Sequence, residues 1–211
     1  MIVERHVVIR SIREGNWPSG SLGSMRMDYA ANPEQLVHDI AAKMREASLD
    51  WGDNSEVWTH QLKLSLRDLL QSKGTNKRDV LYSHTEEDIH EFLLDVVVWD
   101  RTSGEGVILA VESEWIQHVE AIAEDFWKLM VVKSPLKLMV FGLNDNARTH
   151  SQKAVWEKLR ECLELYRDHR KGERYVFMDF ARGATRRAWW FEVPANGSLK
   201  PVPEPQYVTF V

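Results

Sequence analysis

Apolar and polar positions along the chain follow two patterns, one typical of helices and one typical of strands. Where apolar residues recur every three or four positions, a helix with one buried face is expected. The predicted helices begin near residues 32 and 54 and cover residues 116–132 and 151–169. Where apolar residues form short runs between turn residues, a strand is expected. The predicted strands cover residues 79–83, 91–99, 106–114, 136–143, 174–180 and 187–193, with a further short strand at 6–10.

Capping residues mark the first two helices. Asn32 is expected at the N-cap, followed by Pro33, whose fixed φ suits the first helical position. The second helix is expected to start near Asn54 and to end before Gly74. Outside the periodic segments, residues 16–24 are predicted to form a loop and the Pro-rich residues 201–206 an extended tail.

Strands and helices are mixed along the chain, as in α/β proteins. Between residues 55 and 143 the predicted order is helix, three strands, helix and strand, and a further helix and two strands follow. The chain has 211 residues, of which 44% are hydrophobic, so it can bury a substantial core. We therefore expect a single domain over residues 1–211.

Three acidic residues interrupt two of the apolar strands. Asp95 lies in the predicted strand 91–99, and Glu112 and Glu114 lie in the strand 106–114. The turn residues between these strands predict a β-hairpin that places Asp95 opposite Glu112, with Glu114 on the same face because strand side chains repeat every two residues. A register shifted by one residue would instead separate Asp95 from Glu112 onto opposite faces.

Carboxylates in buried strands need a compensating positive charge. An unpaired buried carboxylate costs free energy, and two of them about 5 Å apart repel each other by about 3 kcal/mol at an effective dielectric constant near 20. A hard divalent cation with oxygen ligands would reverse that repulsion. The sequence therefore predicts a divalent-metal site at these acids, while exposed strand ends on a half-solvated sheet are the alternative explanation.

Charge and composition restrict the function classes further. The net charge of −5 argues against a protein that coats nucleic acid nonspecifically, but it leaves a nuclease possible because an acidic metal site itself adds negative charge. The sequence has neither a signal-like start nor an apolar run of about 18 residues, so we expect no membrane association and a cytoplasmic protein. The single Cys162 fits a reducing compartment and a packing role.

The order of elements and the placement of the acids resemble the PD-(D/E)xK nuclease superfamily. The resemblance covers residues 55–143, the nuclease-like core. Asp95 matches the family's metal-binding aspartate and Glu112 its second acidic ligand, while Glu114 stands where lysine is usual, as in the minority of restriction enzymes that use Glu-x-Glu. The resemblance implies an α/β fold with a restriction-endonuclease-like mixed sheet flanked by helices, with N-terminal helical and C-terminal strand additions.

Three further sets of residues are weaker candidates. Lys128 could replace the missing lysine, but on a helical wheel it lies almost opposite the apolar stripe, which favours a solvated side chain. Glu56 could add an acid from the preceding helix, although a glutamate in the first turn is also explained by the helix dipole. His84 and His90 lie in an acidic segment without metal-ligand spacing, which favours a polar loop.

These observations lead to two functional hypotheses. The first is a Mg²⁺- or Mn²⁺-dependent phosphodiesterase, an endonuclease acting on DNA, in which Asp95 and Glu112 bind the metal and Glu114 activates the attacking water, with Lys128 as a possible further catalytic residue. Cleavage of both strands would need two sites, which a homodimer would supply. The alternative is a nuclease fold without activity that serves as a binding or interaction module.

Overall fold

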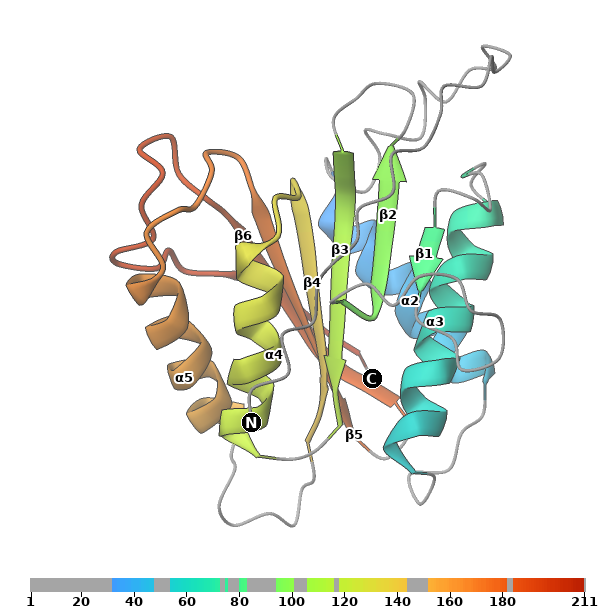
Figure 1. Cartoon of the computed structure of the whole chain (residues 1–211). Helices are drawn as coiled ribbons and strands as arrows, with labels where there is room; N and C mark the ends of the chain where they lie inside the picture. The colour runs from blue at the N-terminus through green and yellow to red at the C-terminus, as the bar shows by residue number, and fades with distance from the viewer. Residues whose placement is uncertain are drawn as a thin grey trace, which may run out of the picture.

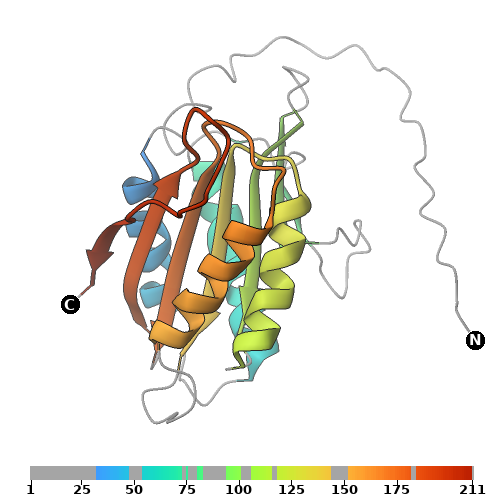
Figure 2. The same ribbon diagram turned by 90° about the vertical axis from the view of Figure 1, so that its left-hand side faces the viewer.

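The computed structural model describes residues 32–47, 54–72, 75, 80–82, 94–100, 106–115, 118–143, 152–181 and 184–210. These residues form one seven-stranded mixed sheet with helices on both faces (Figures 1 and 2). The helices are α2 (Pro33–Glu46), α3 (Ser55–Ser72), α4 (Val119–Val131) and α5 (Gln152–Leu165). The strands are β1 (Val80–Tyr82), β2 (Val96–Asp100), β3 (Gly106–Glu114), β4 (Leu136–Gly142), β5 (Arg174–Ala181), β6 (Ala184–Glu192) and β7 (Gln206–Thr209). The expected α/β fold with a mixed sheet flanked by helices is confirmed.

The strands lie in the sheet in the same order as in the chain, from β1 to β7. The central pairs β3–β4 and β4–β5 are parallel, and the pairs toward both edges are antiparallel. Helix α4 connects β3 to β4 and α5 connects β4 to β5, as parallel neighbours require. Both helices therefore start at the carboxyl ends of the parallel strands, and they cover one face while α2 and α3 cover the other (Figure 1).

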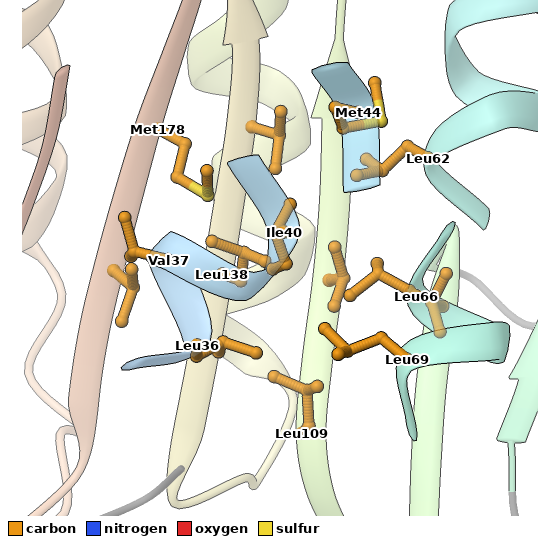
Figure 3. Packing of buried hydrophobic residues seen from close by; sticks show 14 of the residues in the cluster. Leu36, Val37, Ile40, Met44, Leu62, Leu66, Leu69, Leu109, Leu138 and Met178 are labelled. Carbon is orange, nitrogen blue, oxygen red and sulfur yellow. The ribbon is translucent and has the colours of Figure 1, made fainter. Parts of the chain in front are cut away.

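Each face of the sheet has its own apolar core. On one face, apolar side chains of α2 and α3 pack against the sheet around Leu109, Leu138 and Met178 (Figure 3). On the other face, α4 and α5 cover an aromatic core in which Phe177 and Trp189 stack at 5.6 Å. Alternate residues of the central strands feed the two cores, so these strands are apolar on both faces.

The predicted helix starts are confirmed at the capping residues. Asn32 Oδ1 accepts the Gln35 amide at 3.2 Å, and Pro33 is the first helical residue. Asn54 Oδ1 accepts the Val57 amide at 2.9 Å at the start of α3. Within the part of the chain that the structure describes, no helix is long and apolar enough to cross a membrane.

Two predicted elements differ from the structure. The helix expected over 151–169 ends at Leu165, where the chain turns so that the His169 ring is buried against Leu163 and Tyr175. The predicted tail at 201–206 leads into strand β7, which pairs antiparallel with β6 and has no apolar alternation of its own. Several other predictions lie outside the described residues: the strand at 6–10, the loop at 16–24, the helix end at Gly74, and His84 and His90.

Candidate functional site

The hairpin of β2 and β3 has the predicted register. Val96 pairs with Val111 and Val98 with Leu109, and continuing this register by one residue places Asp95 opposite Glu112. The register shifts between Val98 and Trp99, close to the turn, whose residues 101–105 lie outside the described part of the chain. The shift does not affect the end of the hairpin that carries the acids.

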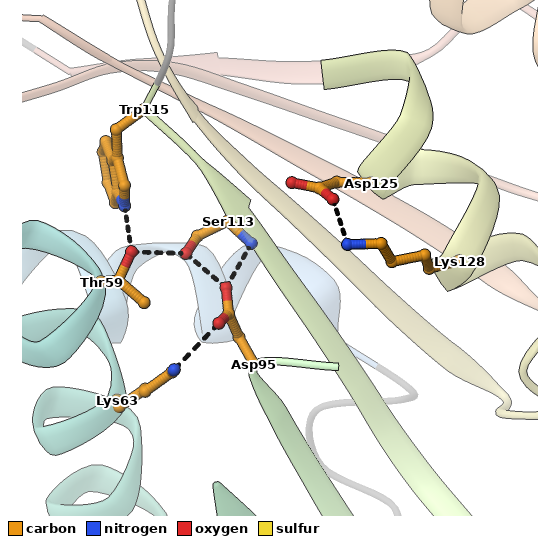
Figure 4. Close-up of polar contacts among 7 residues, drawn as sticks. All are labelled: Thr59, Lys63, Asp95, Ser113, Trp115, Asp125 and Lys128. Carbon is orange, nitrogen blue, oxygen red and sulfur yellow. Dashed lines mark hydrogen bonds and ion pairs between the residues drawn. The ribbon is translucent and has the colours of Figure 1, made fainter. Parts of the chain in front are cut away.

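Asp95 does not lie within a strand, which corrects the prediction. Strand β2 begins at Val96, and the backbone bends at Asp95. Asp95 Oδ2 accepts both the Ser113 backbone N–H at 2.9 Å and the Ser113 hydroxyl at 2.6 Å (Figure 4). The Asp95 carboxylate thus accepts the Ser113 N–H in place of a backbone carbonyl from a further residue of β2. Side-chain hydrogen bonds of this kind compete with the regular backbone bonds between strands. The carboxylate therefore turns to the α3 side of β3.

Lys63 on α3 is the residue that the sequence reasoning missed. Its Nζ lies 2.9 Å from Asp95 Oδ1, and only 10% of its side chain is exposed. Lysine is rarely buried unless it is paired. The available signal was the position of Lys63 beside Leu62 and one turn after Thr59, next to the apolar stripe of a confidently predicted helix.

A chain of polar contacts connects Asp95 to the end of β3. The Trp115 indole N–H donates to Thr59 Oγ1 at 2.9 Å, and Thr59 Oγ1 lies 3.5 Å from Ser113 Oγ (Figure 4). Because the single hydroxyl proton of Ser113 goes to Asp95, the Thr59 hydroxyl is the donor in the contact with Ser113. Helix α3 thus positions the Asp95 carboxylate through both Lys63 and Thr59.

Glu112 is a buried carboxyl group with an unsatisfied oxygen. The residue is 4% exposed, and its Oε1 has no hydrogen-bond partner among the described residues. Burial first, and then the negative charges of Asp95 and Asp125, raise the pKa of Glu112 to about 9, although Lys128 acts in the opposite direction. In the absence of a cation, Glu112 is therefore mostly protonated at neutral pH.

Lys128 lies on the flank of α4 next to this group. It forms an ion pair with Asp125 one turn earlier in the helix, and 42% of its side chain is exposed. The Asp125 hydrogen bond raises the pKa of Lys128 most, and Glu112 and Asp95 raise it further, so the ammonium group lies within electrostatic reach of both predicted metal ligands. The solvated side chain that the helical wheel favoured for this lysine is not contradicted by this exposure.

The three predicted acids do not converge into one cluster. Among the described residues, no group of three His, Cys, Asp or Glu side chains is placed to hold a metal ion together. Strand alternation places Glu114 on the face of Glu112, whereas Asp95 turns toward α3. Glu56, in the first turn of α3, is exposed.

Comparisons with known proteins add little to this geometry. No protein-family model and no curated protein matches the chain. A solved structure, the central domain of yeast acetyl-CoA carboxylase, aligns with 80% of this chain at 10% sequence identity and a TM-score of 0.33. The aligned part is 33% of that structure's chain.

Proposed function

We propose that the protein is a Mg²⁺- or Mn²⁺-dependent phosphodiesterase that cleaves DNA, related to the PD-(D/E)xK nucleases with a Glu-x-Glu motif. The observation that supports this proposal most is the Glu112 carboxyl, which is buried, has an unsatisfied oxygen and lies near Asp95. A buried carboxyl in such a place costs stability unless a ligand uses it.

Asp95 and Glu112 fit a magnesium site of the type found in phosphoryl-transfer enzymes. Mg²⁺ commonly takes only one or two carboxylates and completes its shell with water and substrate phosphate, so a cluster of three acids is not required. When bound, the ion would supply positive charge for the phosphate and lower the pKa of a water molecule. Ser113 already fixes one oxygen of Asp95 by two hydrogen bonds, which orients the carboxylate in advance.

The two lysines and Glu114 have distinct roles in this proposal. Lys63 contacts Asp95 from α3, and Lys128 on α4 lies within electrostatic reach of Asp95 and Glu112, so each would add positive charge near a phosphate bound at the acidic pair. Glu114 occupies the position of the usual lysine and would orient or deprotonate the attacking water.

Cleavage assays with single-residue variants test the proposal. We expect Asp95→Asn and Glu112→Gln each to lower the rate of Mg²⁺- or Mn²⁺-dependent cleavage of plasmid and single-stranded DNA by about 100-fold or more. Glu124→Gln, an exposed acid on α4, is the matched control and should cleave at the wild-type rate. Because glutamine resembles the protonated form of Glu112, the Glu112→Gln protein should fold normally, which separates lost chemistry from lost structure.

A nuclease-fold binding module is the second candidate, and the Lys63–Asp95 ion pair favours it. Asp95 has a complete set of partners from the protein alone, so it does not depend on a metal. A module would bind DNA or protein without divalent cations, and binding would survive Asp95→Asn. Absence of cleavage in all metals and on all substrates, together with such binding, would decide for the module.

A further inference from the structure

A concave groove lies on the α5 side of the sheet, between the start of α5 and strands β6 and β7. Its volume is about 340 Å³, within the usual range of small-ligand sites. The lining includes Gln152, Lys153, Trp156, Arg187, Trp189 and Tyr207.

Strand register relates this groove to the candidate metal site. Glu112 pairs with Met139, Met139 with Phe177, Phe177 with Trp189, and Trp189 with Tyr207, so these residues form one row across the sheet. The row starts at the metal site and ends in the groove. With about 4.8 Å between neighbouring strands, β6 and β7 lie about 14 Å and about 19 Å from β3. Helices α4 and α5 both begin at the carboxyl ends of the parallel strands (Figure 1), and the start of α5 lines the groove.

The groove combines aromatic surfaces with basic groups. The Tyr207 side chain, 72% exposed, can turn without disturbing the core, and the partly buried Trp156 packs edge-on against Trp189 at 5.8 Å. Lys153 lies at the rim, 3.7 Å from Glu157 in an exposed ion pair that water weakens. Asp179 beneath the groove accepts Gln152 Nε2 at 2.6 Å and the Arg187 backbone N–H at 2.7 Å, so its negative charge is engaged by the protein.

Trp189 supplies an unused donor. The residue is only 5% exposed and lines the groove, and its indole N–H has no hydrogen-bond partner among the described residues. A buried indole N–H normally finds an acceptor, since leaving it unsatisfied costs about 1–3 kcal/mol. The lining of the groove therefore includes an indole whose N–H is unsatisfied among the described residues.

We infer that this groove binds one unpaired base of the DNA strand that the metal site cleaves. The base would stack on Tyr207 and Trp156, and the neighbouring phosphates would meet Lys153 and Arg187. The straight-line span of about 14–19 Å passes beneath α4 and α5, so a strand that joins the two sites around these helices needs at least about four to six nucleotides at about 3.4 Å each. The inference rests on the proposed nuclease function for the identity of its ligand.

Binding of a single-stranded hexanucleotide that contains 2-aminopurine tests the inference. The measurement is made in EDTA with the full chain, so that no cleavage occurs and stacking is read as fluorescence quenching. We expect Tyr207→Ala to weaken binding by about 5- to 100-fold, the loss of one base–aromatic stack, and Tyr207→Phe to bind like the wild type. Lys153→Gln should weaken binding several-fold, and the duplex form of the same sequence should bind less well than the single strand.

Control variants separate this inference from the proposed activity. Leu165→Ala, at the exposed far end of α5, should leave binding unchanged. Wild-type affinity in both Tyr207→Ala and Lys153→Gln would overturn the inference even if the protein cleaves DNA. Conversely, tight binding that depends on Tyr207, with no cleavage in any metal, would remove the proposed nuclease function and leave the base-binding groove in place.

Discussion

The buried carboxyl group of Glu112 makes the stability of the folded protein depend on pH. Its pKa rises from 4.5 in the unfolded chain to about 9 in the folded protein, because the carboxyl is buried beside Asp95. The folded state therefore holds a proton that the unfolded state releases. The contribution of this bound proton to the free energy of unfolding is complete below pH 4.5 and is lost as the pH rises toward 9.

We predict that the metal-free wild type loses stability relative to Glu112→Gln between pH 5 and pH 9. The difference in the free energy of unfolding between the two proteins should change by at most about 1.4 kcal/mol per pH unit, the limit for a single proton. Denaturant unfolding in EDTA at several pH values measures it. Saturating Mg²⁺ should flatten the wild-type curve because a cation lowers the pKa of Glu112. Parallel pH profiles for the two proteins in EDTA would contradict the assigned protonation of Glu112.

Lys63 makes a second prediction at the scale of single residues. Its ammonium contacts the Asp95 oxygen that Ser113 leaves available, so it repels any cation that approaches there. We predict that Lys63→Met binds Mn²⁺ about tenfold more tightly, a change of about 1.4 kcal/mol, as measured by calorimetry. The same variant should melt at a lower temperature in EDTA, because a buried ion pair is broken.

Lys158→Met is the matched control for Lys63→Met. Lys158 forms a surface pair with Glu161 on α5, far from the acids in sequence, so its loss should change neither Mn²⁺ affinity nor stability by much. Weaker Mn²⁺ binding by Lys63→Met would mean that Lys63 mainly holds Asp95 in place.

Helix α3 carries the two side chains that hold the Asp95 carboxylate in place. Its start is fixed by the Asn54 side chain, and Thr59 and Lys63 follow within the first three turns. We predict that Asn54→Ala lowers the free energy of unfolding by about 1 kcal/mol, whereas Asn54→Asp retains most of it. Thermal and urea unfolding monitor the effect. If alanine and aspartate at this position give the same stability, the N-cap is not significant for this helix.

The sequence predicts an element well when the pattern of apolar and turn residues within that element determines it. The apolar runs and the turn residues were enough for β3 and for the register that brings Asp95 opposite Glu112, because a shifted register would reverse every buried side chain. The bend at Asp95 and the approach of Lys63 depend on contacts of Asp95 with Ser113 of β3 and with Lys63 of α3. Such contacts between distant segments leave no periodic signal, and β7 likewise exists through its pairing with β6.

At the scale of the whole molecule, a buried polar network ties the helical layer to the sheet at the end opposite the candidate sites. Lys137 Nζ on β4 donates to Met130 O at 3.0 Å, to Glu173 Oε2 at 3.2 Å and to Tyr175 Oη at 3.2 Å. His169 Nε2 lies 2.8 Å from Leu163 O and must donate to it, so the neutral ring accepts the Tyr175 hydroxyl at Nδ1, 3.0 Å away. Burial, the larger effect, lowers the pKa of Lys137, while Glu173 opposes that shift.

We predict that Lys137→Met destabilises the protein by about 3–5 kcal/mol, because Glu173 is left as a buried charge without its counter-ion. Adding Glu173→Gln should restore part of that loss, and a double-mutant cycle of urea unfolding gives the coupling between the two residues. Additive effects of the two substitutions would show that the pair contributes no coupling. DNA cleavage by the proteins that remain folded should stay near the wild-type rate, since Lys137 bonds to Met130, Glu173 and Tyr175 and not to Asp95 or Glu112.

The agreement between strand order and chain order also bears on how the chain folds. Each strand from β1 to β7 pairs with its neighbours in sequence, so every pairing closes a loop no longer than one helix and its connections. Loop-closure entropy is small for such pairings, and folding is faster when contacts are local in sequence. A chain emerging from the ribosome can therefore add its strands one at a time, each onto an edge that the preceding segment has already formed.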